Sequence, residues 1–197
     1  MVATQEGTDS TVRCPWATGP WLTPYHDDEW GVALHDDRRL FELLVLEGAQ
    51  AGLSWLTVLK RRDAYRRAFG GFDPAHVAGF GEAKVRALMS DPGLIRHRMK
   101  LESAVANAAG ILRLRDDLGS FDAYLWDWVG GVPVRNSWRR STQVPAQTPL
   151  SAALAKDLAG RGFRFVGPIT CYSFLQSAGL VVDHLVECFR YEAPSGG

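Results

Sequence analysis

Apolar side chains recur every three or four positions along most of this chain, which is the spacing of amphipathic helices. In segment 36–52, Asp36 is a candidate N-cap, and Leu40, Phe41, Leu44 and Val45 would form one apolar face. The same spacing predicts a long helix over 98–118 and shorter helices over 54–69, 73–80, 82–91, 148–163, 168–179 and 181–189. Alternation with a period of two is scarce, and the best candidate strand is the short segment 163–166. The pattern therefore predicts an all-α fold, or one very nearly so.

Length and composition predict a single folded domain. The chain has 197 residues, of which 46% are hydrophobic, so one sizeable core can form. We expect this domain over 13–192, where it could comprise two helical lobes, between disordered tails at 1–12 and 193–197. A polar, basic loop is expected over 133–147.

The net charge is zero, with 22 basic and 22 acidic residues, which excludes a uniformly basic nucleic-acid binder. The charges are unevenly distributed, however. Residues 1–37 contain seven acidic residues and one basic residue, whereas residues 55–115 contain twelve basic and five acidic ones. A basic face suits a partner of negative charge; the alternative is a set of ordinary solvated helix faces.

The three cysteines, Cys14, Cys171 and Cys188, are too few and odd in number for a disulfide framework. The sequence shows no charged-then-apolar leader and no uncharged run of about eighteen apolar residues, so we expect neither secretion nor a membrane span. These features predict a protein of a reducing cytoplasm, where paired Cys and His side chains meet metal ions more often than they form disulfides.

Four residues from the two ends of the chain could bind one metal ion. His184 and Cys188 are four positions apart, which would place both side chains on one face of the helix predicted over 181–189. Cys14 and His26 could complete a Cys2His2 set, and a shell with all four positions filled is structural rather than catalytic. The alternative is ordinary surface or core residues, because the spacing is not that of a compact zinc finger.

Segment 82–105 contains two helical patterns joined by a glycine turn. Gly93 would allow a tight turn with outward-facing amides, while Leu94 and Ile95 would anchor the turn to the core. Basic side chains and one histidine follow at once: Arg96, His97, Arg98 and Lys100. This arrangement suits a DNA phosphate, which positions a protein without reading sequence. The alternative is an ordinary connection between two helices.

The chain is rich in tryptophan, with seven residues. Trp16, Tyr25 and Trp30 lie near the N-terminus, and Trp55 follows the predicted helix that carries Glu47. Glu47 lies among leucines and would need a partner if it were buried. Aromatic rings with one carboxylate could form a pocket for a flat cationic group. The alternative is that the tryptophans belong to the core and Glu47 faces solvent.

Together these segments resemble the 3-methyladenine DNA glycosylase I family of bacterial alkylation-repair enzymes. The resemblance begins with RCPW at Arg13 and continues through YHDDEWGV, LFELLVLEGAQAGLSWLTVLKRR and GLIRHRMK. It ends with RGFRFVGPITCYSFLQSAGLVVDH and Cys188, and so covers nearly all of the chain beyond the first dozen residues. Leu22, Ala49 and Met99 depart from the family's usual residues.

The resemblance implies a helical fold of the helix–hairpin–helix glycosylase superfamily. It implies one structural zinc that ties the N-terminal and C-terminal segments through Cys14, His26, His184 and Cys188. It also implies a base-binding pocket formed by Tyr25, Glu47, Trp55 and Ser173. We add Trp16 to this pocket because it belongs to the same aromatic cluster. For DNA it implies a side chain that wedges into the duplex, Leu53, and a hairpin made by Gly93, Leu94, Ile95, Arg96, His97 and Lys100.

The implied activity is hydrolysis of the N-glycosidic bond of 3-methyladenine in alkylated double-stranded DNA, after the base has been flipped out. Free 3-methyladenine would be the product, and the enzyme would act as a monomer in the bacterial cytoplasm, associated with the nucleoid. The next lysine after Lys100 is Lys156, so we expect a monofunctional glycosylase without strand cleavage. The alternatives are a non-catalytic zinc-stapled DNA-binding module and a hydrolase that uses an open zinc.

Overall fold

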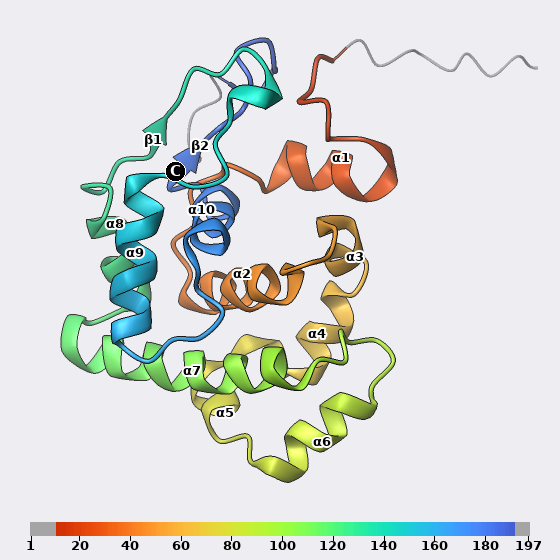
Figure 1. Ribbon diagram of the computed structural model, residues 1–197, viewed down its shortest axis with the longest axis vertical. Helices are drawn as coiled ribbons and strands as arrows, with labels where there is room; N and C mark the ends of the chain where they lie inside the picture. The colour runs from red at the N-terminus through yellow and green to blue at the C-terminus, as the bar shows by residue number, and fades with distance from the viewer. Residues whose placement is uncertain (1–10, 192–197) are drawn as a thin grey trace, which may run out of the picture.

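The computed structural model describes residues 11–191, and these are mostly helical, as predicted. The longest helix, α7 (Arg98–Leu118), crosses the molecule, and α2 (Asp37–Gln50) lies between α7 and α10 (Pro168–Ser177) (Figure 1). The other helices are α1 (Gly19–Asp28), α3 (Trp55–Leu59), α4 (Arg62–Ala68), α5 (Pro74–Ala78), α6 (Glu82–Ser90), α8 (Phe121–Asp127) and α9 (Pro149–Gly160). Two 3₁₀ turns, η1 (Gly70–Phe72) and η2 (Ser141–Gln143), and two strands, β1 (Val134–Arg135) and β2 (Val181–Val182), complete the described part.

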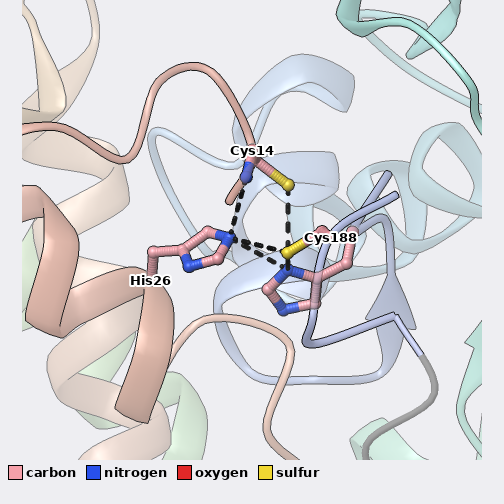
Figure 2. A group of neighbouring side chains, drawn as sticks. Cys14, His26 and Cys188 are labelled. Atoms are coloured by element: carbon pink, nitrogen blue, oxygen red, sulfur yellow. Dashed lines mark hydrogen bonds between the residues drawn. The ribbon is translucent and has the colours of Figure 1, made fainter. Parts of the chain in front are cut away.

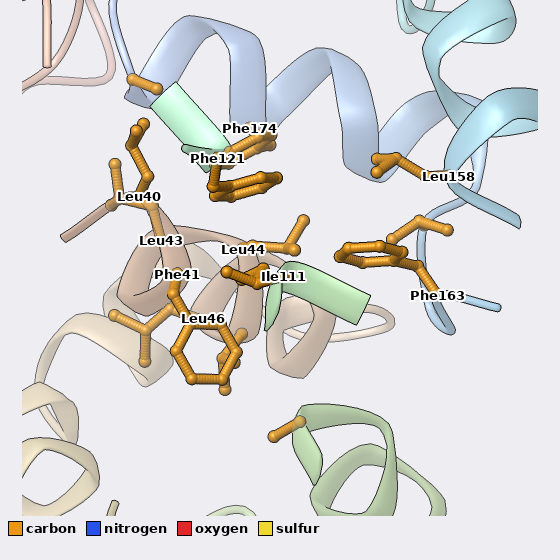
Figure 3. Packing of buried hydrophobic residues seen from close by; sticks show 14 of the residues in the cluster. Leu40, Phe41, Leu43, Leu44, Leu46, Ile111, Phe121, Leu158, Phe163 and Phe174 are labelled. Atoms are coloured by element: carbon orange, nitrogen blue, oxygen red, sulfur yellow. The ribbon is translucent and has the colours of Figure 1, made fainter. Parts of the chain in front are cut away.

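Helix α2 is the centre of the core because it is apolar on nearly every side. Every residue from Leu40 to Ala49 is buried. The rings of Phe121 and Phe174 stack beside it with centroids 6.4 Å apart, and the cluster continues toward α9 (Figure 3). The two carboxylates of this helix, Glu42 and Glu47, are therefore buried too, and each must find partners inside the protein.

The predicted helix starts are confirmed where a local capping side chain defines them. Asp36 accepts a hydrogen bond from the amide of Arg39 (2.8 Å) at the start of α2. Asp73 caps α5 directly before Pro74, and Thr148 caps α9. These bonds join residues two or three positions apart, which is why the sequence predicts them.

The single helix predicted over 54–69 is wrong, because the chain breaks it into α3 and α4. Arg62, the first residue of α4, is buried and forms ion pairs with Glu42 of α2 and with Glu29 after α1 (2.6 Å to Glu29). Arg66 pairs with Glu42 as well (2.9 Å). Two arginines of the charged run that looked like a solvated face therefore satisfy a carboxylate in the core.

The helix predicted over 181–189 is also wrong. Strand β2 occupies its start and pairs in parallel with β1, and residues 183–191 form an irregular loop with turns. Gly179, before β2, has a φ of +73°, and a Cβ there would lie 2.3 Å from the backbone of Val32. The chain can reverse at this close approach only with glycine, and the two valines then pair with a strand that is distant in sequence.

Two further expectations need correction or fall outside the described residues. Segment 163–166 forms no strand, and Phe165 within it has a positive φ of 56°. The tail expected at 193–197 and most of the one at 1–12 lie outside residues 11–191. Helix α1 was not predicted, since Pro20 and Pro24 interrupt the apolar pattern there. Within the described residues, no helix has the length and apolar character that a membrane span requires.

Candidate active site

A cavity of about 280 Å³ lies between α1, α2, α3 and α10. Much of its wall is aromatic, contributed by Trp16, Tyr25, Trp30 and Trp55. The other lining residues are Cys14, Glu47, Gln50, Ser141, Val144, Ser173, Gln176, Ser177, Asp183 and Leu185. The structure thus brings all five residues expected in a base pocket (Trp16, Tyr25, Glu47, Trp55 and Ser173) to one cavity.

The aromatic wall is built from rings that pack against each other at an angle. The rings of Tyr25 and Trp55 have centroids 5.3 Å apart and an interplanar angle of 49°. Trp16 lies 6.3 Å from Tyr25 and meets Trp30 edge-on, with centroids 5.0 Å apart. Such packing fixes the rings in place, so their exposed faces form a rigid platform for a planar ligand.

Glu47 is connected to Tyr25 through a serine that the sequence interpretation did not include. The hydroxyl of Tyr25 donates to Ser177 Oγ (3.0 Å), and Ser177 Oγ donates to Glu47 Oε1 (2.5 Å). Burial raises the pKa of Glu47 from 4.5 to about 7, although the hydrogen bond from Ser177 opposes this rise. Burial also raises the pKa of Tyr25, so its hydroxyl stays protonated and remains a donor.

Two buried polar atoms of the cavity have no partner among the described residues. They are Glu47 Oε2 and Trp55 Nε1, an acceptor and a donor. A buried polar group without a hydrogen bond costs about 1–3 kcal/mol, and such groups are rare in folded proteins. Their presence on one cavity indicates a place where a ligand supplies the missing partners.

Asp183 is a second buried carboxylate on this cavity, and the sequence interpretation missed it. Its Oδ1 accepts hydrogen bonds from Asn136 (2.7 Å) and Trp138 (2.8 Å), and its Oδ2 accepts from Gln176 (2.7 Å) and Tyr172. Asp183 therefore joins α10 to the loop that carries Ser141 and Val144 into the cavity wall. In the sequence, the one feature that could have pointed to Asp183 as a site residue is its position next to the metal-ligand candidate His184.

Beside the cavity, the four predicted metal ligands converge, and all four residues are buried. Their potential ligand atoms lie within 4.8 Å of one another. Figure 2 shows Cys14, His26 and Cys188 directed at a common centre. His184 Nδ1 lies 3.2 Å from His26 Nε2, 3.6 Å from Cys188 Sγ and 3.8 Å from Cys14 Sγ. Residues 184–188 are not helical, contrary to the prediction. His184 and Cys188 nevertheless reach the other two ligands, because β2 and the turns after it bring them there.

The contacts behind the two imidazoles set which nitrogen faces the centre. His184 Nε2 lies 3.0 Å from the carbonyl of Trp30, and His26 Nδ1 lies 2.7 Å from a carboxylate oxygen of Asp27. Because both partners are acceptors, these nitrogens carry the protons. Burial lowers the pKa of both histidines, to about 4 for His184, so the inner nitrogens present lone pairs. Two inward-facing lone pairs 3.2 Å apart, flanked by two sulfur atoms, form a set of donors that could hold a metal ion.

The predicted hairpin lies between α6 and α7, but its amides are used differently from the expectation. The amide of Gly93 donates to the Asp91 carboxylate (2.8 Å), and that of Ile95 donates to the Tyr65 hydroxyl (3.3 Å). Leu94 is buried and anchors the turn, as expected. Gly93 has no positive φ; a Cβ there would instead lie 2.8 Å from that of Ala64.

The side chains around the hairpin divide into exposed and buried ones. Arg96 and His97 are exposed, and so is Leu53 in the loop between α2 and α3. Lys100 is buried, and its ammonium donates to the carbonyls of Ala49 (2.8 Å) and Ala51 (2.6 Å). This contact differs from the expected phosphate contact, because the charge of Lys100 is directed at the C-terminal end of α2.

Known proteins are similar to this chain in sequence and fold. A family model described as methyladenine glycosylase matches residues 16–191. The DNA-3-methyladenine glycosylase of Haemophilus influenzae is 46% identical over 179 residues, covering 90% of this chain and 97% of the relative. DNA-3-methyladenine glycosylase 1 of Escherichia coli is 44% identical over 180 residues, covering 91% of this chain and 96% of the relative.

Among solved structures, a tyrosine-to-phenylalanine variant of 3-methyladenine DNA glycosylase I in complex with 3-methyladenine has a TM-score of 0.89 to this protein. It is 39% identical, and the match covers 92% of this chain and 98% of that one. The family match spans the aromatic cavity and its buried carboxylate. The chain belongs to the methyladenine glycosylase family.

Proposed function

We propose that this protein is a DNA-3-methyladenine glycosylase of base-excision repair. The observation that carries the proposal is the aromatic cavity with an unpaired, buried oxygen of Glu47. Relatives over nearly the whole chain bear this enzyme's name, and one similar structure contains 3-methyladenine. The substrate is alkylated double-stranded DNA, and the products are free 3-methyladenine and an abasic site.

The target base must leave the stack before it can enter the cavity. An alkyl group on the ring nitrogen at position 3 makes adenine cationic, so the glycosidic bond is already weak and its cleavage releases a neutral base. The cavity binds this cation through two kinds of attraction. The ring faces of Trp55 and Tyr25 attract positive charge, and Glu47 supplies a negative charge and an acceptor, Oε2. Normal adenine is neutral and gains less from both.

The reaction is hydrolysis without strand cleavage. The described residues that line the cavity include no lysine, so no side-chain amine there can attack the sugar. A leaving group that departs as a neutral base needs no general acid. Glu47 and the aromatic rings therefore act by binding and orienting the cation, and the same negative charge favours the positive charge that develops on the sugar.

We propose that the four-residue cluster holds one structural zinc. In a tetrahedral site with bonds of about 2.3 Å to sulfur and about 2.0 Å to nitrogen, ligand atoms lie roughly 3.3–3.8 Å apart. The separations of 3.2–3.8 Å between His184 Nδ1 and the other three ligand atoms fit that geometry. When bound, zinc cross-links the segment before α1 to the segment after β2 and supplies no open position for catalysis. Four protein ligands would fill the coordination shell of the zinc, which argues against a hydrolase that uses an open zinc.

We further propose that the segment from α6 through Gly93 to α7 is the helix–hairpin–helix that contacts DNA. Arg96 and His97 are exposed beside the turn and can meet phosphates. Leu53 is 42% exposed at the end of α2, close in sequence to both Glu47 and Trp55, and would occupy the space left by the flipped base. Gly93, Leu94, Ile95 and Lys100 support this surface through internal contacts. The protein would act as a monomer beside the bacterial chromosome.

The decisive experiment measures 3-methyladenine released from methylated duplex DNA, with spontaneous release subtracted. Wild-type protein should release it catalytically and leave the DNA strand intact. Glu47→Gln should reduce this release strongly while leaving the affinity for undamaged DNA nearly unchanged. DNA binding without any release would favour the non-catalytic zinc-stapled DNA-binding module instead.

A further inference from the structure

Ser177 is the polar connection between α10 and the two polar pocket residues Tyr25 and Glu47. It lies at the C-terminal end of α10 and is 4% exposed. A hydroxyl has one hydrogen to donate, and an ionised carboxylate only accepts. Ser177 therefore gives its hydrogen to Glu47 Oε1 and accepts the hydrogen of Tyr25, in one directed chain across the cavity wall.

We propose that Ser177 is a positioning and specificity-determining residue of the excision reaction. Its hydroxyl holds the Glu47 carboxylate so that Oε1 is occupied and Oε2 alone is presented to the cationic base. This inference rests on the proposed function, since it assigns a role within the same pocket.

The contacts of Glu47 show why one hydroxyl can have this influence. Among residues 11–191, Ser177 is the donor to the Glu47 carboxylate, and Oε2 has none. The bond of 2.5 Å has the length of a charge-assisted hydrogen bond, which favours the ionised carboxylate against the effect of burial. Without it, the carboxylate would lose its one fixed orientation and would ionise only at higher pH.

Within the described part of the chain, no charged group near the cavity can replace the Ser177 hydroxyl as a donor to Glu47. Tyr25 of α1 approaches from one side, but its hydroxyl is directed at Ser177. Asp183 after β2 is negative and has both oxygens engaged by other donors. Arg62 of α4 is committed to Glu42 and Glu29. Trp55 of α3 is neutral, and Cys14 belongs to the metal cluster, so the ionisation of Glu47 depends on Ser177.

Discrimination between damaged and normal bases depends on this ionisation. An ionised Glu47 attracts the cationic 3-methyladenine and gains little from neutral adenine. A protonated Glu47 would offer a hydroxyl and no negative charge, so the preference for the cation would fall. Ser177 thereby extends selective excision to lower pH than a buried, unsupported carboxylate would allow.

The experiment compares pH profiles of 3-methyladenine release for wild type, Ser177→Ala and Ser177→Thr. Loss of one charge-assisted hydrogen bond should move the acid limb of Ser177→Ala upward by about one pH unit. Release at pH 6.5 should then fall roughly tenfold, while release at pH 9 stays near the wild-type value. Ser177→Thr keeps the hydroxyl and should therefore keep the wild-type acid limb of the pH profile. A purely structural role of Ser177 would not require this agreement.

Ser103→Ala is the matched control. Ser103 is also a buried helical serine, at 5% exposure, but its hydroxyl donates to the carbonyl of Lys100 away from the cavity. This variant should leave the pH profile unmoved, and thermal unfolding should show that each variant is folded. A folded Ser177→Ala with the wild-type acid limb, or a Ser177→Thr that behaves like Ser177→Ala, overturns the inference while leaving the proposed glycosylase intact. A wild type that releases no 3-methyladenine overturns both.

Discussion

Glu47→Gln should weaken excision and, at the same time, make the protein's stability less sensitive to alkaline pH. Burial raises the pKa of Glu47 from 4.5 to about 7. Because the folded state binds this proton more tightly than the unfolded state, the stability contributed by protonated Glu47 is complete below about pH 4.5 and is lost as the pH rises through about 7. A rise of that size corresponds to about 3 kcal/mol of unfolding free energy above pH 8.

The uncharged glutamine does not lose this energy. The difference in unfolding free energy between Glu47→Gln and wild type should therefore move in favour of the variant by about 2.5 kcal/mol between pH 5 and pH 8. Urea denaturation at several pH values measures this difference, and the titration of other groups cancels in it. Excision should fall in the same variant by roughly 10- to 150-fold, because a hydrogen bond to a charged group contributes about 1.5–3 kcal/mol.

Glu42→Gln is the matched control for this pair of effects. Glu42 lies on the same helix and is equally buried, but Arg62 and Arg66 satisfy its carboxylate. Removing its charge leaves the buried guanidinium of Arg62 with Glu29 as its remaining ion-pair partner, so this variant should lose about 1.5–3 kcal/mol of stability. A stability difference for Glu47→Gln that does not change with pH would refute the reasoning that its carboxylate is buried without a positively charged partner. Wild-type excision by that variant would show that the pocket is elsewhere.

The other predictions concern the metal, the hairpin and Lys100. Purified protein should contain one zinc per chain, and Cys188→Ser should lose it together with several kcal/mol of stability, about the scale of structural zinc sites; less than stoichiometric zinc with freely reactive thiols at Cys14 and Cys188 would contradict the metal assignment. Gly93→Ala should lower DNA affinity and stability through overpacking against Ala64 by about 1–3 kcal/mol, and the double change with Ala64→Gly should recover both if the 2.8 Å approach is the cause. Lys100→Met should lower the free energy of unfolding by about 1–3 kcal/mol, because two carbonyls lose their donor; unchanged stability with weaker DNA binding would identify Lys100 as a phosphate contact instead.

Features that arise from contacts between neighbouring residues could be predicted from the amino-acid sequence. The apolar spacing predicted the long helix α7 and the buried helix α2, and the caps at Asp36 and Thr148 predicted where α2 and α9 begin. Residue type and spacing suggested the four metal-ligand candidates, resemblance to a family implied four pocket residues, and Trp16 was added from the aromatic cluster; the structure brings each set together. The helix predictions succeed because helix propensity and capping act over a few positions.

Features that depend on partners far apart in the chain became visible in the three-dimensional fold. The two valines of β2 form a strand because β1 lies beside them, although their spacing suits a helix. Arg62 belongs to a basic run that looked solvated, and Lys100 was predicted to contact DNA, yet each satisfies buried acceptors on other elements. The role of Ser177 depends on Glu47, which lies 130 positions away. A buried polar group must be paired wherever the fold places it, and that pairing is a property of three-dimensional packing rather than of local sequence.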